Sequence, residues 1–226
     1  MEQRARARQL AAEHLAKGDA TGWFEHLYRE AEEGKAEIPW ADLQPNPNLT
    51  EFWQGHAMPS AGKTASIIGC GLGDDAEQVA RWGFETIAFD ISESAIRACQ
   101  RRFSGSGVDY VIANLFAAPR QWTRHFDFVV ECYTLQVLPQ HLRRQAIKCI
   151  AGLVRDQGYL LVVSRGREEQ DSEGQMPWPL TRLELDQLED FGLRTISFED
   201  YVDRESPPVR RFRVLYQKAS PRSQER

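Results

Sequence analysis

The amino-acid sequence predicts an α/β fold: a doubly wound, seven-stranded, mostly parallel sheet with an antiparallel C-terminal strand and an N-terminal helical cap. Two observations predict it. From about residue 64, short β-rich runs alternate with helical patterns, which is typical of a parallel sheet covered by helices on both faces. Beyond residue 180, two β-rich runs follow one another around Pro207 and Pro208, which indicates an antiparallel hairpin at the end of the sheet.

The predicted strands are segments rich in β-branched and aromatic residues. They cover residues 64–69, 85–90, 108–112, 126–132, 158–164, 193–199 and 211–217. Apolar residues at helical spacing predict helices at 74–82, 92–103, 139–154 and 183–191. The helix that starts at Ser92 has a good N-cap residue and turns Ile96 and Cys99 to one face, so we expect this cysteine in the core.

The first 60 residues lack β-rich runs and hold several tryptophans between prolines that interrupt helices. We expect residues 1–60 to form a helical cap, or lid, that belongs to the same domain as residues 61–218, and the polar residues 219–226 to form a disordered tail. Glu2 and Glu13 interrupt the basic residues near the N-terminus, and no apolar stretch follows them. This pattern favours a surface amphipathic helix over a transit peptide.

Composition excludes several classes of protein. The 226 residues are 42% hydrophobic and 27% charged, which is enough for a sizeable core and excludes wholesale disorder. The longest apolar run, Tyr159–Val163, is far shorter than the roughly 20 residues that cross a bilayer, so we expect no membrane partner. The net charge of −5 disfavours binding to nucleic acid and favours small molecules. The four cysteines form no C-x-x-C pair and no zinc spacing, which indicates a reduced, cytoplasmic protein without a metal.

The strongest local signal is the glycine loop, in which Gly69, Gly71 and Gly73 alternate between a buried strand and the start of a helix. Glycine removes the Cβ that would block a ligand, and the helix start presents unpaired amides. Asp90 ends the next strand, where an acid can accept hydrogen bonds from both ribose hydroxyls. Together these features predict a nucleoside site. The alternative for the glycines is a tight structural turn, and the alternative for Asp90 is an acid that stabilises the start of the helix beside it.

The residues after the glycine loop discriminate between nucleoside cofactors. The dinucleotide pattern G-x-G-x-x-G needs glycine at position 74, where this chain has Asp74, followed by Asp75. Two carboxylates would repel a pyrophosphate but suit a cationic ligand. S-adenosylmethionine (SAM) carries an ammonium and a sulfonium and no phosphate, so the loop favours SAM over NAD. An NAD(P)-dependent oxidoreductase and a non-catalytic nucleoside-binding or scaffold protein remain as alternatives.

Several segments together resemble class I SAM-dependent methyltransferases, especially bacterial small-molecule enzymes of the thiopurine and halide/thiol methyltransferase group. Gly69–Ala76 resembles the first motif of this family, Ala88–Ser92 its ribose-binding motif, Ala113–Phe116 its adenine-edge motif and Phe126–Pro139 its fourth-strand segment. The resemblance implies a Rossmann-like fold in which residues 61–218 are the SAM-binding methyltransferase domain. It also implies S-adenosylhomocysteine (SAH) as the product.

By this resemblance, the cofactor contacts lie on loops that follow the first four strands. They are Gly69, Cys70, Gly71, Gly73, Asp74, Asp90, Ile91, Asn114, Leu115 and Glu131. Ile67 stands where many members have an acid that holds the methionine ammonium, so we expect backbone carbonyls at Gly69 and near Glu131, with Asp74, to take its place. Asn114 replaces the usual aspartate; it can still accept from the adenine amino group and can donate to a ring nitrogen.

The resemblance implies in-line methyl transfer to an O, S or N atom of a small-molecule acceptor, in which alignment and water exclusion are the main contributions of the protein. A base is optional; the candidates are Glu131, Tyr133 and His141, although a helix start like that of His141 is commonly a surface position. The lid and acceptor wall are assigned to aromatic residues, for which hydrophobic packing is the alternative. They are Trp23, Tyr28, Trp40, Tyr133 and Trp178. We expect a monomer or a homodimer.

Overall fold

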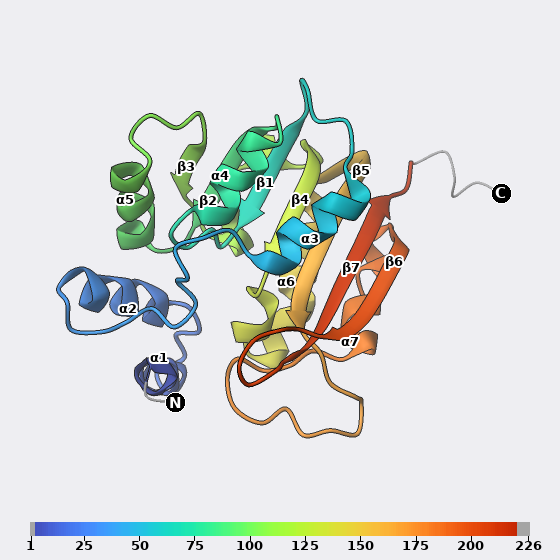
Figure 1. Ribbon diagram of the computed structural model, residues 1–226. Helices are drawn as coiled ribbons and strands as arrows, with labels where there is room; N and C mark the ends of the chain where they lie inside the picture. The colour runs from blue at the N-terminus through green and yellow to red at the C-terminus, as the bar shows by residue number, and fades with distance from the viewer. Residues whose placement is uncertain (1–2, 221–226) are drawn as a thin grey trace.

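The computed structural model describes residues 3–220 and confirms the predicted α/β fold (Figure 1). Within this range the seven strands form one sheet in the order β3-β2-β1-β4-β5-β7-β6, in which β7 pairs antiparallel with β5 and β6 and all other pairs are parallel. The strands are β1 (Thr64–Ile68), β2 (Glu85–Asp90), β3 (Asp109–Ile112), β4 (Phe126–Cys132), β5 (Val154–Arg165), β6 (Leu193–Val202) and β7 (Arg210–Lys218).

The register of the central strands brings their carboxyl ends to one edge of the sheet. Ile68 of β1 pairs with Phe89 of β2 on one side and with Glu131 of β4 on the other. The residues that follow these strands therefore emerge at the same level, although they are far apart in the sequence. The central strands are apolar because both faces of the sheet are covered, as is usual for parallel sheets.

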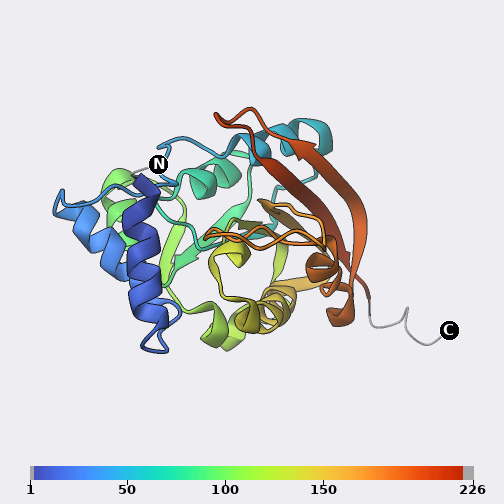
Figure 2. The ribbon, with the colours of Figure 1, turned by 90° about the horizontal axis from the view of Figure 1, so that it is seen from below.

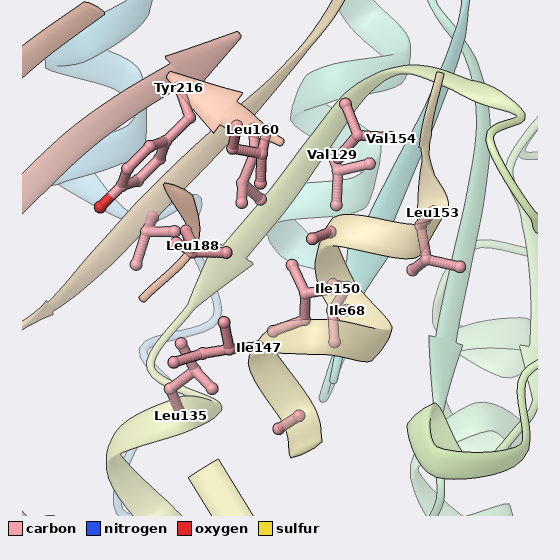
Figure 3. Packing of buried hydrophobic residues seen from close by; sticks show 14 of the residues in the cluster. Ile68, Val129, Leu135, Ile147, Ile150, Leu153, Val154, Leu160, Leu188 and Tyr216 are labelled. Atoms are coloured by element: carbon pink, nitrogen blue, oxygen red, sulfur yellow. The ribbon is translucent and has the colours of Figure 1, made fainter. Parts of the chain in front are cut away.

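Helices cover both faces of the sheet. The helices are α1 (Gln3–Leu15), α2 (Gly22–Glu32), α3 (Pro47–His56), α4 (Asp74–Arg81), α5 (Glu93–Arg102), α6 (Gln140–Leu153) and α7 (Arg182–Asp186). Helices α3, α4 and α5 contribute to the apolar cluster on one face, and α6 and α7 to the cluster on the other. In the second cluster, Ile147 and Ile150 of α6 lie close to Val129 of β4 and Leu160 of β5 (Figure 3). As predicted, Cys99 is fully buried in the first cluster.

The first two helices form a small apolar cluster together with Met176 at the edge of the sheet, where α1 lies along α2 (Figure 2). The N-terminal helix expected from the sequence is α1, which buries Ala7, Leu10 and Ala11. Glu25 of α2 joins this cluster to α5, because its carboxylate accepts hydrogen bonds from the Ser92 hydroxyl at 2.7 Å and the Ser94 amide at 3.0 Å. In contrast, α3 packs in the core on the sheet, so only the first part of the predicted cap stands apart from it.

Some predicted boundaries were wrong. The fifth strand begins at Val154, four residues early, because Val154 pairs with Phe126 across a register shift. The predicted helix 183–191 is limited to Arg182–Asp186; the chain then tightens into a 3-10 turn that ends at Gly192, whose φ of +79° suits glycine. The expected disordered tail, 219–226, lies outside the described residues except for its first two positions. No helix in the described part of the chain is long and apolar enough to span a membrane.

Candidate functional site

A cleft of about 1000 Å³ opens at the carboxyl ends of β1, β2, β4 and β5. It lies where the strand order reverses between β1 and β4, which is the usual ligand position in open α/β sheets. Loops that follow these strands form its floor. The walls come from α1, α2 and residues 39–48, 176–177 and 201–206.

The glycine loop forms part of this floor, with φ angles of +59°, +55° and +90° at Gly69, Gly71 and Gly73. A Cβ at Gly69 would lie 2.6 Å from Thr134 Oγ1, and one at Gly73 would lie 2.7 Å from Tyr110 Oη. Side chains of the protein itself therefore approach the loop closely. This crowding is sufficient to explain why glycine stands at Gly69 and Gly73, and no ligand is needed to explain it. The same folding leaves the loop and Cys70 on the surface of the cleft.

Asp90 lies beside the glycine loop at the end of β2, as predicted, and lines the cleft. One carboxylate oxygen accepts a hydrogen bond from the Gly71 amide at 3.0 Å, and the other accepts from the Ser92 amide at 2.9 Å. Burial raises the pKa of Asp90 to about 6, against the opposing effect of these amides. The group is therefore ionised at neutral pH and keeps free lone pairs for hydroxyl donors. The adjacent Ile91 lines the same part of the cleft.

Asn114 and Leu115 follow β3 and also line the cleft. The Asn114 side-chain oxygen accepts a hydrogen bond from the Phe116 amide at 2.9 Å and so caps a short 3-10 turn, η1 (Leu115–Ala117). The side-chain amide nitrogen has no partner among the described residues and can donate to a ligand. Of the two predicted adenine contacts, this arrangement favours donation from the Asn114 side-chain nitrogen to a ring nitrogen.

The two acids after the glycine loop differ in their surroundings. The carboxylate of Asp74 forms two 2.8 Å bonds to the guanidinium of Arg102, so its charge is already balanced; the sequence analysis did not anticipate this ion pair. Asp75 accepts a hydrogen bond from the Asn46 amide at 2.6 Å and has no cationic partner among the described residues. Burial raises its pKa to about 6. Both acids line the cleft, and Asp75 is the one whose charge is left for a cationic ligand.

Of the three candidate bases, only Tyr133 lines the cleft. The side chain of Glu131 is fully buried beneath it and accepts hydrogen bonds from the amides of Thr134 at 2.6 Å and Leu135 at 2.9 Å. Burial raises the pKa of Glu131 to about 7. His141 is exposed at the start of α6 and lines a separate, smaller pocket. Burial also raises the pKa of Tyr133, which keeps it a phenol at neutral pH.

The predicted lid residues separate into two groups. Tyr28 and Trp40 line the cleft, and the Trp40 indole donates a 2.9 Å hydrogen bond to the Tyr28 hydroxyl. Trp23 is 1% exposed and belongs to the core of the cap, where it stacks on Phe24 at 3.9 Å between ring centroids. Trp178 packs against the same cap cluster and does not line the cleft. Tyr28 and Trp40 are therefore the aromatic residues of the predicted lid that can contact a ligand.

Sequence reasoning missed a polar network that lines the cleft around Tyr133. The side-chain Nδ2 of Asn48 donates to the Tyr133 hydroxyl at 2.9 Å, and the Tyr201 hydroxyl donates to the side-chain Oδ1 of Asn48 at 2.6 Å. Asn46 caps α3, because its side-chain oxygen accepts from the backbone amide of Asn48 at 3.0 Å. The Asn-Pro-Asn sequence before that helix was a cap signal, but no local pattern links it to Tyr201, which lies 153 residues away from Asn48.

Solved structures share this architecture. One, from a study of the conversion of a disulfide bond into a thioacetal group during echinomycin biosynthesis, has a TM-score of 0.70 at 17% identity and covers 91% of this chain and 95% of its own. The N-methyltransferase NodS from Bradyrhizobium japonicum, solved with SAH, has a TM-score of 0.67 at 18% identity and covers 86% and 99%. The 1,6-didemethyltoxoflavin-N1-methyltransferase from Burkholderia thailandensis, solved with its namesake ligand and SAH, has a TM-score of 0.67 at 15% identity and covers 94% and 91%.

The sequence itself carries a family signal. No curated protein matches the chain at a significant level. Residues 67–158 match the family model of the methyltransferase domain. The matched segment starts just before the glycine loop and includes Asp90, Asn114 and Tyr133, the residues that form the floor of the cleft. Residues 67–158 are therefore similar in sequence to this methyltransferase domain family.

Proposed function

We propose that this enzyme transfers the methyl group of SAM to an O, S or N atom of a small-molecule acceptor. The observation that carries the proposal is the position of Asp90, an ionised acid with free lone pairs beside the glycine loop and on the surface of a cleft of about 1000 Å³. A cleft of this volume accommodates a nucleoside cofactor together with a small acceptor. The two neighbours solved with SAH, one of which also holds 1,6-didemethyltoxoflavin, support a small acceptor.

The groups on the floor of the cleft fit SAM. In this proposal, Asp90 holds the ribose hydroxyls, Asn114 and Leu115 hold the adenine, and the backbone of the glycine loop holds the methionine part. Asp75 attracts the ammonium, because Arg102 neutralises Asp74 and Ile67 offers no charge. When bound, SAM supplies a methyl group on a positively charged sulfur, which a nucleophile can attack directly.

In this proposal, the side chains of the enzyme position the two reactants and exclude water from them. Tyr28 and Trp40 lie over the glycine loop, since a Cβ at Gly71 would lie 3.0 Å from the Tyr28 hydroxyl, and they exclude water from this part of the cleft. Tyr133, held by Asn48, faces the acceptor side. Holding two reactants in line can lower a barrier by about 7–11 kcal/mol at best, so no base is needed in this proposal.

Calorimetric titration with SAH tests the cofactor assignment without the unknown acceptor. We expect micromolar binding of SAH and SAM and no binding of NAD or NADP. Binding of a dinucleotide alone, or no binding of SAH by protein shown to be folded, would overturn the proposal. A positive result justifies a screen of small thiols, phenols and hydroxylated heterocycles, with SAH release as the readout. Thiols and heterocycles enter this screen because of the resemblance to the thiopurine and halide/thiol group.

A further inference from the structure

The cleft carries opposite charge on its two sides. Asp75 and Asp90 lie on the β1 and β2 side, where the proposed function places the cofactor. Arg165 lies at the end of β5 on the other side, and Arg4 and Arg8 of α1 line the cleft there too. Strands β1 and β4 separate β2 from β5 in the sheet, so the two charged regions do not neutralise each other directly.

Arg165 is held in place by its backbone, while its side chain has no partner. Its amide donates to the Gln136 side-chain oxygen at 2.7 Å, and its carbonyl oxygen accepts from the Leu180 amide at 2.9 Å. The guanidinium is partly buried and makes no hydrogen bond or ion pair with any residue of the range 3–220. Burial is the main cause that lowers its pKa; Arg4 and Arg211 lower it as well, whereas Glu205 and Tyr133 oppose them.

Two nearby arginines on β7 differ from Arg165 because carboxylates pair with their guanidinium groups. Arg211 is 2% exposed and forms ion pairs with Asp203 at 2.6 Å and with Glu205, and its guanidinium carbon lies 4.6 Å from the ring centroid of Tyr133. Arg213 is paired with Glu199 at 2.6 Å. A partly buried guanidinium without an acceptor loses solvation and gains nothing in return, so an anion from outside the chain would be bound favourably at Arg165.

We propose, on the basis of the proposed function, that the methyl acceptor is a carboxylic acid whose carboxylate is bound by Arg165. A planar guanidinium matches a carboxylate through two parallel hydrogen bonds. A singly charged carboxylate is favoured over a phosphate monoester, because Glu205 acts electrostatically on Arg165 and would repel a dianion more strongly. The apolar part of the acceptor lies against the apolar side chains that line this part of the cleft, namely Val137 and Met176.

Benzoate and its neutral isostere benzamide test this assignment. Each is titrated into protein saturated with SAH, and SAH binding is measured first for every variant. We expect millimolar or tighter binding of benzoate, weakened by added salt, and at least about tenfold weaker binding of benzamide, since a charged hydrogen-bonded pair is lost. Arg165→Gln should lose this preference, and Arg165→Lys should retain part of it.

Arg194→Gln is the matched control, because Arg194 is an exposed arginine of β6, outside the cleft, whose side chain makes no hydrogen bond or ion pair within residues 3–220. We expect it to bind benzoate like the unaltered protein. Absence of benzoate binding to the SAH complex, equal binding of benzoate and benzamide, or unchanged binding in Arg165→Gln would overturn the inference. Tighter binding of phenyl phosphate than of benzoate would overturn the choice of a carboxylate. Failure to bind SAH would instead contradict the proposed function.

Discussion

The carboxylate of Asp90 accepts a hydrogen bond from the backbone amide of Gly71, with 3.0 Å between Oδ2 and N. This bond ties the end of β2 to the loop that follows β1, and both partners line the cleft. The bond orients the carboxylate and at the same time fixes the glycine loop. Asp90 therefore has a structural partner and retains the capacity to bind a ligand.

Replacing Asp90 separates these two roles. We expect Asp90→Asn to weaken SAH binding by about tenfold or more, the scale for hydrogen bonds to a charged group. We also expect the free energy of unfolding to fall, because the two carboxylate oxygens accept from the Gly71 and Ser92 amides, and asparagine offers an NH₂ group in place of one of these acceptors. Calorimetry and urea unfolding measure the two effects.

Asp109→Asn is the matched control for this substitution. Asp109 is exposed at the start of β3, at the end of the strand opposite to the cleft, so the change should leave both SAH affinity and stability unaltered. If Asp90→Asn bound SAH as tightly as the unaltered protein did, the ribose assignment would be wrong.

The fold was predictable because its signals are local. The central strands are continuous apolar runs, and a glycine loop between a strand and a helix marks the site within a few residues of sequence. The boundary of β5 was not predictable, since Val154 joins the strand only by pairing with Phe126 across a register shift. That pairing depends on tertiary structure, which no spacing within residues 154–158 reveals.

The proposed cofactor side of the site was more predictable than the proposed acceptor side. Asp90 follows directly from the end of a strand, whereas the neutralisation of Asp74 depends on Arg102, which lies 28 residues further along the chain. Trp23 resembled a lid residue in sequence, but only packing decides whether a tryptophan is in a core or a cleft. Whether the Arg165 guanidinium has a partner likewise depends on every element packed around it, which the local sequence does not reveal.

A substitution in the glycine loop tests the steric argument. Gly73 has φ +90°, and a Cβ there would lie 2.7 Å from Tyr110 Oη and 3.1 Å from Cys99 Sγ. We expect Gly73→Ala to lower the free energy of unfolding by about 2 kcal/mol or more, through left-handed strain and crowding together. Gly105→Ala is the control, because its Cβ would meet nothing within 4 Å, and its effect should stay within about 0.5 kcal/mol. Equal effects in urea unfolding would contradict this reading of the loop.

Trp40 tests the lid. It is 37% exposed, lines the cleft and donates to the Tyr28 hydroxyl, so its removal opens the side of the cleft above Gly71. We expect Trp40→Ala to weaken SAH binding by about tenfold, comparable with the loss of one well-placed contact, while the protein remains folded. Leu43→Ala is the control, since Leu43 is 62% exposed in the same segment and does not line the cleft. Calorimetry and thermal unfolding of both variants measure the outcome; unchanged SAH affinity in Trp40→Ala would reject the lid.

Glu131 predicts a pH dependence of stability. Burial raises its pKa from 4.5 to about 7, so the folded state binds more protons than the unfolded state between these values. The free energy of unfolding should therefore fall as pH rises from about 4.5 to about 7, by up to about 3 kcal/mol in total from this group.

Glu131→Gln isolates this contribution. The side-chain oxygen can still accept from the amides of Thr134 and Leu135, and the amide has no charge to desolvate. Its new NH₂ group would replace Oε2, which has no partner in the described structure, so the variant carries a constant penalty that does not depend on pH. The free energy of unfolding is measured in urea at pH 5 and pH 8 for both proteins. Relative to the unaltered protein, the variant should be more stable at pH 8 than at pH 5. Glu85→Gln, at the exposed start of β2, should show no such shift. Parallel pH profiles for Glu131→Gln and the unaltered protein would mean that the buried carboxyl titrates near its ordinary pKa, and that it does not oppose folding at neutral pH.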